Sequence, residues 1–197
     1  MSWNALETYD RGIDFFTEVV HGIPDGRWRS SSPCAGWTAL DVLGHVGEAT
    51  AMGSRILRGG ELEFEPHHPP SAALDGPPRD WWDAVAADAR DALTDVGDLD
   101  RVVDSPMGPR TVRDGLSFPA VDLFLHGWDL GAAAGRAVRF PEPAIEFIRA
   151  LFASIPDEVT RRPSVFGAAV DAPADADATD QVIAFSGRDP RWTSPST

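Results

Sequence analysis

The stretch Phe118–Gly131, FPAVDLFLHGWDLG, decides the fold that we expect for this chain. Apolar residues surround an acid and an imidazole, Asp122 and His126, which stand four residues apart. On an α-helix this spacing places both side chains on one face, one turn apart. Burying such groups without hydrogen-bonding or ionic partners lowers the stability of the folded protein. The stretch therefore predicts a buried helix whose polar groups need a partner, and a metal ion is the natural one.

A second helix carries the residue that would complete such a site. Thr38 followed by Asp41 has the pattern of an N-terminal capping box and predicts a helix that runs to about Arg58. His45 lies within the apolar stripe of this helix. Two imidazoles and one carboxylate suit Zn²⁺, Ni²⁺ or Fe²⁺ and leave positions open for water or substrate. The predicted metal ligands are therefore His45, Asp122 and His126.

A purely structural interpretation stays open from the spacing alone. A lone histidine on an apolar stripe is more often a hydrogen-bonded core residue than a ligand, and an acid–histidine pair at i, i+4 is often only a hydrogen bond. Asp129 could be a further ligand, although we favour a hydrogen-bonding group behind the ligands or at the helix end. Cys34 precedes a helix N-terminus, which would stabilise a thiolate, but we favour a small buried thiol. We interpret Trp37 and Trp128 as core anchors rather than substrate platforms.

The remaining apolar periodicity predicts further helices and one long connection. The predicted helices cover about residues 3–20, 38–58, 80–96, 117–135 and 141–154. Asp80 is the expected N-cap of the third helix, and the fourth begins at either Thr111 or Ser117. Residues 59–79 hold many Pro and Gly and show no helical period. The pattern predicts an all-α, up-and-down four-helix bundle with a long crossover connection before its third helix.

Composition places these helices in one domain and excludes some partners. With 197 residues, of which 43% are hydrophobic, the chain can bury a full core. We expect residues 1–160 to form the bundle and residues 161–197 to form a strap with a short helix around Thr179–Phe185 that packs on it. No apolar run approaches the ~20 residues needed to span a bilayer, and a net charge of −14 repels phosphate backbones. We therefore expect neither membrane nor nucleic-acid partners, and the single cysteine favours the cytoplasm.

Four motifs give the chain a resemblance to a known family. The motifs are SPCAGWT from Ser32, DVLGHV from Asp41, DLFLHGWDLGAAAG from Asp122 and GRDPRW from Gly187. With them the chain resembles the mycothiol-dependent maleylpyruvate isomerase N-terminal family of the DinB-like superfamily over nearly its whole length. The resemblance implies a DinB-like four-helix bundle and a divalent metal, commonly zinc or nickel, at the positions of His45, Asp122 and His126.

The chain departs from the family pattern in two respects. The characterised isomerases carry Glu at the position of Asp122, and Asp is shorter by one methylene. The chain is also too short for the separate C-terminal domain of the full isomerase, so substrate-binding residues from that domain have no counterpart to transfer.

Two functions follow from the resemblance and stay open. In the first, the metal holds the sulfur of a small thiol such as mycothiol as a thiolate, which attacks an electrophilic carbon in an isomerisation or S-transfer. Its partners would be the small-molecule thiol and the electrophile, and a homodimer is left open. In the second, a non-catalytic bundle with weak or lost metal binding acts as a binding or stress-response module. The three polar residues inside apolar stripes favour the first, whereas the shorter Asp122 and the lack of an obvious base favour the second.

Overall fold

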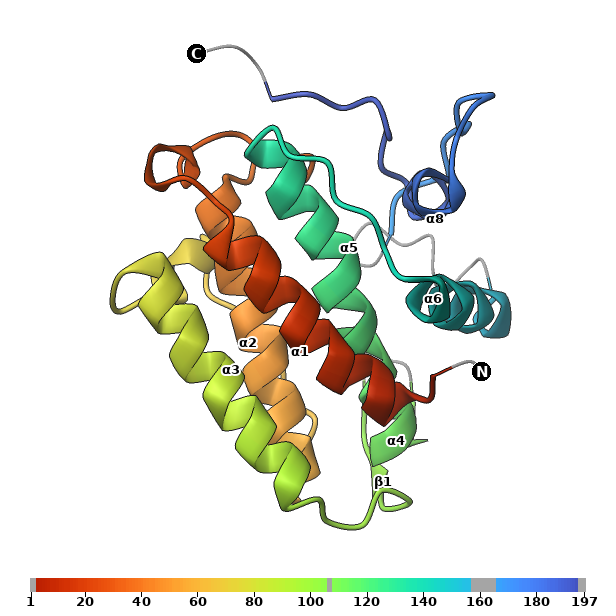
Figure 1. The fold of residues 1–197 in the computed structure, drawn as a ribbon. Helices are drawn as coiled ribbons and strands as arrows, with labels where there is room; N and C mark the ends of the chain where they lie inside the picture. Colours follow the sequence, from red (N-terminus) through yellow and green to blue (C-terminus); the bar gives the residue numbers. More distant parts are fainter. Residues whose placement is uncertain (1–2, 106–107, 157–165, 195–197) are drawn as a thin grey trace.

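The computed structural model describes residues 3–105, 108–156 and 166–194, most of which are helical (Figure 1). The four long helices of a bundle are α1 (Ala5–His21), α2 (Ala39–Leu57), α3 (Pro78–Thr94) and α5 (Ser117–Ala133). The shorter elements are η1 (Asp25–Arg27), η2 (Pro70–Ala73), α4 (Val112–Gly115), α6 (Glu142–Ser154) and α8 (Ala178–Phe185). A small antiparallel pair, β1 (Val102–Val103) and β2 (Arg110–Thr111), precedes α4. The all-α four-helix bundle is therefore confirmed. In the described part of the chain no helix is long and apolar enough to cross a membrane.

Local sequence sets where the helices begin, with one exception to our predictions. The capping box predicted for α2 is present, because Thr38 accepts from the Asp41 backbone N–H and Asp41 accepts from the Thr38 N–H. The prediction that Asp80 caps the third helix is wrong, since α3 already begins at Pro78. Proline is favoured at the first helical position because its missing N–H would have no partner there. Asp80 instead lies in the first turn, where its charge suits the helix dipole.

Both candidate starts for the fourth long helix are used. Thr111 caps the single turn α4 by accepting from the Asp114 backbone N–H at 3.1 Å. The chain then turns at Leu116, and α5 begins at Ser117. Pro119 therefore lies in the first turn of α5, where its ring does not break an intrahelical hydrogen bond. A continuous helix from Thr111 would be kinked at Pro119, and the restart at Ser117 avoids this.

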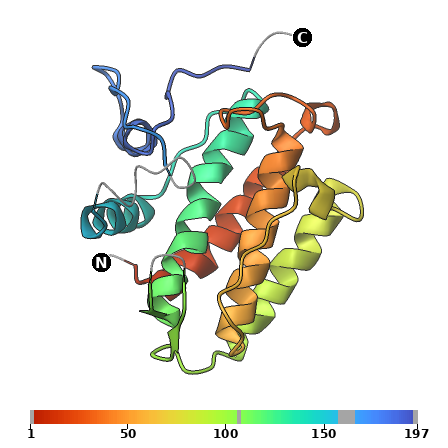
Figure 2. The ribbon, with the colours of Figure 1, turned by 180° about the vertical axis from the view of Figure 1, so that it is seen from behind.

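The long connection between α2 and α3 lets these two neighbours run in the same direction (Figure 2). At their C-terminal ends the Gly97 N–H donates to the Leu57 carbonyl at 3.0 Å. Further towards their N-terminal ends, the Trp81 ring in the first turn of α3 lies against Gly47 in the middle of α2, where a side chain would not fit. The strictly alternating up-and-down order is therefore wrong, although the long crossover is confirmed. A parallel pair of neighbours requires a connection as long as the bundle itself.

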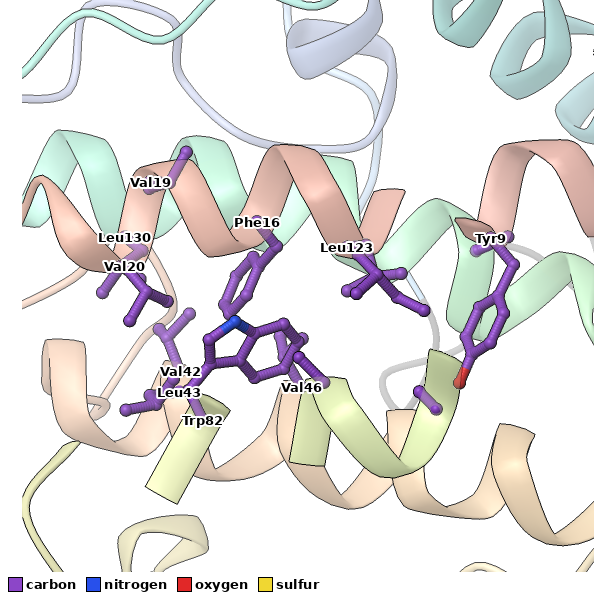
Figure 3. Packing of buried hydrophobic residues seen from close by; sticks show 14 of the residues in the cluster. Tyr9, Phe16, Val19, Val20, Val42, Leu43, Val46, Trp82, Leu123 and Leu130 are labelled. Atoms are coloured by element: carbon purple, nitrogen blue, oxygen red, sulfur yellow. The ribbon is translucent and has the colours of Figure 1, made fainter. Parts of the chain in front are cut away.

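The main core lies between the four long helices (Figure 3). Phe16 of α1 packs edge-on against Trp82 of α3, with ring centroids 4.6 Å apart. The Trp82 indole N–H donates to Thr17 Oγ1 at 2.9 Å, and the buried Tyr9 hydroxyl donates to the Thr50 carbonyl at 2.8 Å. Each such apolar side chain contributes about 1.5–3 kcal/mol by burial. The polar ends of the large aromatic residues are therefore paired while their rings fill the centre.

Helix α5 is buried on two sides, which explains its nearly continuous apolar sequence. One side contributes to the main core through Leu123 and Leu130. The other packs against α6 and α8 in a second cluster that includes Phe124, Ile148 and Ile183. The predicted short helix in the C-terminal segment is thus present as α8. The predicted boundary between bundle and strap, at residues 160–161, lies outside the described residues.

Candidate metal centre

Helices α2 and α5 bring the three predicted ligands together. His45 comes from α2, and Asp122 and His126 come from successive turns of α5. One potential ligand atom of each lies within 4.8 Å of those of the other two. His45 Nε2 is 3.7 Å from Asp122 Oδ2, and the two imidazole centroids are 4.9 Å apart. Ligand atoms around a tetrahedral ion with bonds near 2.1 Å lie about 3.4 Å apart. Small side-chain adjustments would therefore let one ion contact all three.

The protonation of this cluster suits a divalent cation. Burial opposes ionisation of Asp122, but hydrogen bonding to His45 and the nearby His126 outweigh it, so its pKa lies below the usual value. Burial lowers the pKa of His126, which favours the neutral ring. Metal ligands must be an ionised carboxylate and neutral imidazoles. The donor set therefore fits Zn²⁺ or Ni²⁺ in both type and charge.

The cluster is partly open to solvent. The side chains of His45 and Asp122 are 18% and 25% exposed, and that of His126 is 10% exposed. A structural zinc site is normally closed by four protein ligands, whereas a catalytic site keeps a position open. Three donors, one of them a partly exposed carboxylate, correspond to the open, catalytic type of metal site.

Behind His126 lies a second, buried group of polar residues. Asp129 is fully buried, and its Oδ2 is 2.8 Å from His126 Nδ1. Arg188, which follows α8, donates to the same carboxylate through Nε at 2.9 and 3.0 Å and through Nη2 at 2.8 Å. Burial opposes ionisation of Asp129, but Arg188 and His126 hold its pKa far below the usual value. Asp129 is therefore an anion whose charge is balanced inside the protein.

This anion orients the His126 ring. An ionised carboxylate accepts a hydrogen bond, so the proton of neutral His126 belongs on Nδ1, where Asp129 receives it. Nε2 then carries the lone pair. A carboxylate behind a metal-ligating imidazole sets its tautomer and orientation in this way. The local geometry thus prepares one nitrogen of His126 for a ligand.

Cys34, predicted as a small buried thiol, is only partly buried and adds its thiol to this group without forming a second metal site. Its thiol donates to Asp129 Oδ2 at 3.2 Å and lies 3.8 Å from His126 Nδ1. These three residues also satisfy the spacing of a metal cluster. However, the Arg188 guanidinium already provides the cation for Asp129. Burial and the Asp129 charge raise the pKa of the thiol. The group is therefore complete as a network of hydrogen bonds.

Two aromatic rings, neither of them fully buried, flank His45. The half-buried Trp37 ring lies 5.1 Å from His45 and 6.2 Å from His126. Phe64, in the crossover connection, is 38% exposed and lies 5.8 Å from His45 in an edge-on arrangement. Trp37 thus borders the cluster as well as packing on the core, whereas Trp128 is buried in the second hydrophobic cluster.

Sequence reasoning missed Arg188 and Phe64. The motif GRDPRW contributes to the family resemblance, but no local pattern pairs Arg188 with an acid 59 residues away. Phe64 lies in a segment with no helical period, so nothing predicted which helix it would contact.

Residues 9–131 match the model of the mycothiol maleylpyruvate isomerase N-terminal domain. Two curated relatives, both uncharacterized proteins of Mycobacterium tuberculosis, are each 24% identical over 186 residues, covering 94% of this chain and 98% of the relative.

Two solved structures share the fold. The crystal structure of the mycothiol-dependent maleylpyruvate isomerase aligns with a TM-score of 0.59 at 17% identity. A histidine-to-alanine mutant of that enzyme aligns with a TM-score of 0.58 at 16% identity. Both alignments cover 74% of this chain and 67% of the solved chain.

Proposed function

Because the chain belongs to the mycothiol maleylpyruvate isomerase N-terminal domain family, we propose that it binds a divalent metal, zinc or nickel, and uses it in thiol chemistry. His45, Asp122 and His126 are the proposed ligands. The observation that carries the proposal is the convergence of these three donors within 4.8 Å on a partly exposed face between α2 and α5.

The proposed reaction is an isomerisation or S-transfer on a small electrophile, with a low-molecular-weight thiol of the mycothiol type as co-substrate. A bound divalent metal would supply the positive charge that keeps such a thiol deprotonated near neutral pH. The family description and the isomerase in the solved structures support the choice of thiol.

The side chains around the proposed ligands would orient His126 and limit the access of water. Asp129 holds the His126 ring in one tautomer and orientation through the 2.8 Å hydrogen bond to Nδ1. The rings of Trp37 and Phe64 border His45 and would reduce contact with water at the reacting sulfur. Asp122 has the most exposed side chain of the three proposed ligands, so a small molecule could reach an ion there from solvent.

The second candidate is a non-catalytic binding or stress-response module with weak or lost metal binding. One observation favours it. Asp129, the buried carboxylate behind His126, is already hydrogen-bonded to Arg188 and His126 and is therefore not free to act as a general base. The shorter side chain of Asp122 compared with the Glu of characterised isomerases favours the same candidate.

Metal analysis separates the two candidates. Protein is purified without a chelator or a nickel column, and its metal content is measured before and after reloading with zinc or nickel. We expect close to one ion per chain, lost in His126→Ala and retained in the control His67→Ala, whose exposed imidazole pairs with Glu48 on the surface. Wild-type protein that neither contains nor takes up metal would exclude the proposed function.

Activity is tested with the same samples. Loaded wild-type protein should accelerate the reaction of a small thiol with an electrophile such as maleylpyruvate, and His126→Ala should not. Stoichiometric metal without any thiol-dependent activity would favour the non-catalytic module.

A further inference from the structure

A pocket of about 620 Å³ lies at the C-terminal end of α5, away from the candidate metal ligands. Its walls come from η1, the last turn of α5 with the loop after it, the first turn of α8 and residues 190–194. His45, Asp122 and His126 are not among its lining residues. Pockets of about 300–1,000 Å³ are the usual size for small-molecule sites. The molecule therefore has, apart from the candidate metal ligands, a concave surface large enough for a ligand.

The wall of this pocket carries more positive than negative charge. Its lining includes the three arginines Arg27, Arg136 and Arg139 but only one acid, Asp180. Arg139 is balanced by carboxylates, at 2.6 Å from Asp177 and 3.5 Å from Asp180. In the part of the chain that the structure describes, neither Arg27 nor Arg136 has a carboxylate within ion-pair distance. Two arginines without an acid partner therefore line the same pocket, in a chain with 31 acids and a net charge of −14.

The backbone of Arg136 is positioned by the turn that ends α5. The chain leaves α5 through Gly135, whose φ of +72° is left-handed, and the Arg136 N–H donates to the Gly131 carbonyl at 2.9 Å. The guanidinium then lies against Gly22, where any side chain would collide with it. Gly22 has a φ of −81°, which every residue can adopt. The space over Gly22 is therefore occupied by the guanidinium in this arrangement.

Two indole rings and two hydroxyls complete the pocket. Trp128 of α5 and Trp192 of the C-terminal segment line it, together with Thr193 and Ser194. Trp128 is 5% exposed and packs in the second hydrophobic cluster, so its position is determined by the core. Indole rings offer a flat apolar surface, and hydroxyls donate hydrogen bonds to anionic oxygens.

We propose that this pocket binds a small organic anion, a carboxylate or phosphate on a flat apolar body. Arg27 and Arg136 contact the charged group, because guanidinium forms strong charge-assisted hydrogen bonds with both kinds of oxyanion. Trp128 and Trp192 contact the apolar body. The site is independent of the candidate metal centre, so it can bind its ligand whether or not metal is present.

The test uses phenyl phosphate as the probe, with phenol and inorganic phosphate as half-probes that carry only the ring or only the charge. Binding to chelator-treated full-length protein is measured by calorimetry and by the indole N–H signals in NMR spectra. We expect phenyl phosphate to shift the Trp192 signal, identified with Trp192→Phe, and to bind more tightly than either half-probe.

Charge-neutral variants then locate the site. Arg27→Gln and Arg136→Gln should each weaken phenyl phosphate binding about tenfold, the effect of losing one charge-assisted hydrogen bond. The control Arg149→Gln, on α6 and paired with Gln181 outside the pocket, should bind as the wild type does. His45→Ala should also bind normally, which separates this site from the metal centre.

Three outcomes would overturn the proposal. One is the absence of phenyl phosphate binding to wild-type protein at millimolar concentration. Another is equal binding of inorganic phosphate, which would indicate a non-specific effect of charge. The third is a lower melting temperature of Arg136→Gln with unchanged binding, which would mean that Arg136 only stabilises the C-terminal end of α1.

Discussion

The two sides of the His126 ring differ in whether a cation is already present. On one side, His45 and Asp122 form a partly exposed set of donors whose carboxylate is ionised and, among the residues that the structure describes, forms no ion pair with an arginine. On the other, Asp129 is fully buried and is bound by the Arg188 guanidinium. Both sets have the spacing of a metal cluster. The comparison teaches that spacing alone does not identify a metal site, because the charge of the neighbouring residues decides which set still needs a cation.

The buried side also connects the bundle to the C-terminal segment. The family model ends at residue 131, whereas Arg188 follows α8. The residue that balances Asp129, and thereby orients His126, thus lies outside the matched region. A candidate site built by α2 and α5 consequently depends on how the C-terminal segment packs against α5.

The largest effect is expected from removing the internal cation. Arg188→Met should lower the free energy of unfolding by about 3–5 kcal/mol, because Asp129 is left as an uncompensated buried charge. Chemical denaturation of metal-free protein measures this. The matched control Arg113→Met removes a surface pair with Asp100 and should change stability by about 1 kcal/mol or less. The double variant Arg188→Met/Asp129→Leu should regain part of the loss. A change in Arg188→Met no larger than in the control would contradict the described ion pair.

Replacing each carboxylate by its amide should have different effects on the two sides of His126. Asp122→Asn should lose most zinc affinity and leave the melting temperature of metal-free protein nearly unchanged, because the side chain is partly exposed. Asp129→Asn should lower zinc affinity about 10–100-fold through the orientation of His126 and should also destabilise the fold. Competition titrations with a chromophoric chelator and thermal unfolding of the same samples measure both quantities. Equal effects of the two substitutions would remove the distinction between the two sides.

The pH dependence of metal-free protein should reflect the buried side. The pKa of Asp129 in the fold lies far below the unfolded value of about 3.9, so its contribution to stability is present above about pH 4 and is lost as the pH falls through the folded pKa. The lowered pKa of His126 acts in the same direction below about pH 6.5. Stability should therefore fall on acidification, and the fall below pH 4 should be shallower in Asp129→Asn. Denaturation midpoints between pH 7 and 3 test this, and parallel curves for the two proteins would refute it.

The smallest effect is expected at Cys34. Its raised pKa keeps the thiol protonated at pH 8, so iodoacetamide should modify folded protein more slowly than unfolded protein, with the rate increasing at higher pH. Cys34→Ala should cost only about 1 kcal/mol, because Asp129 keeps its bonds to Arg188 and His126. Mass spectrometry follows the labelling. Rapid modification of the folded protein at neutral pH would show that the thiol is activated rather than merely buried.

Sequence alone determined the features that arise within one helix or one turn. The capping box of Thr38 and Asp41 starts α2 where predicted, because its hydrogen bonds join residues three positions apart. Asp122 and His126 face the same way because they are one helical turn apart. The apolar periods located the long helices, and the Pro-rich stretch located the crossover. The Asp80 cap was predicted wrongly because two local signals competed, and the proline before it prevailed.

Only the tertiary structure decided which helices are neighbours and which residues complete the site. The parallel order of α2 and α3 depends on the path of the crossover, which has no periodic pattern to indicate its direction. The pairing of Arg188 with Asp129 joins residues 59 positions apart, and Phe64 meets His45 only because the crossover passes along α2. When the apolar face of a helix is buried, the polar side chains beside it are buried too. These polar groups then need hydrogen-bond or ionic partners inside the protein, which can come from distant parts of the chain. The sequence contains these residues, but the packing of α5 against its neighbours determines what each of them touches.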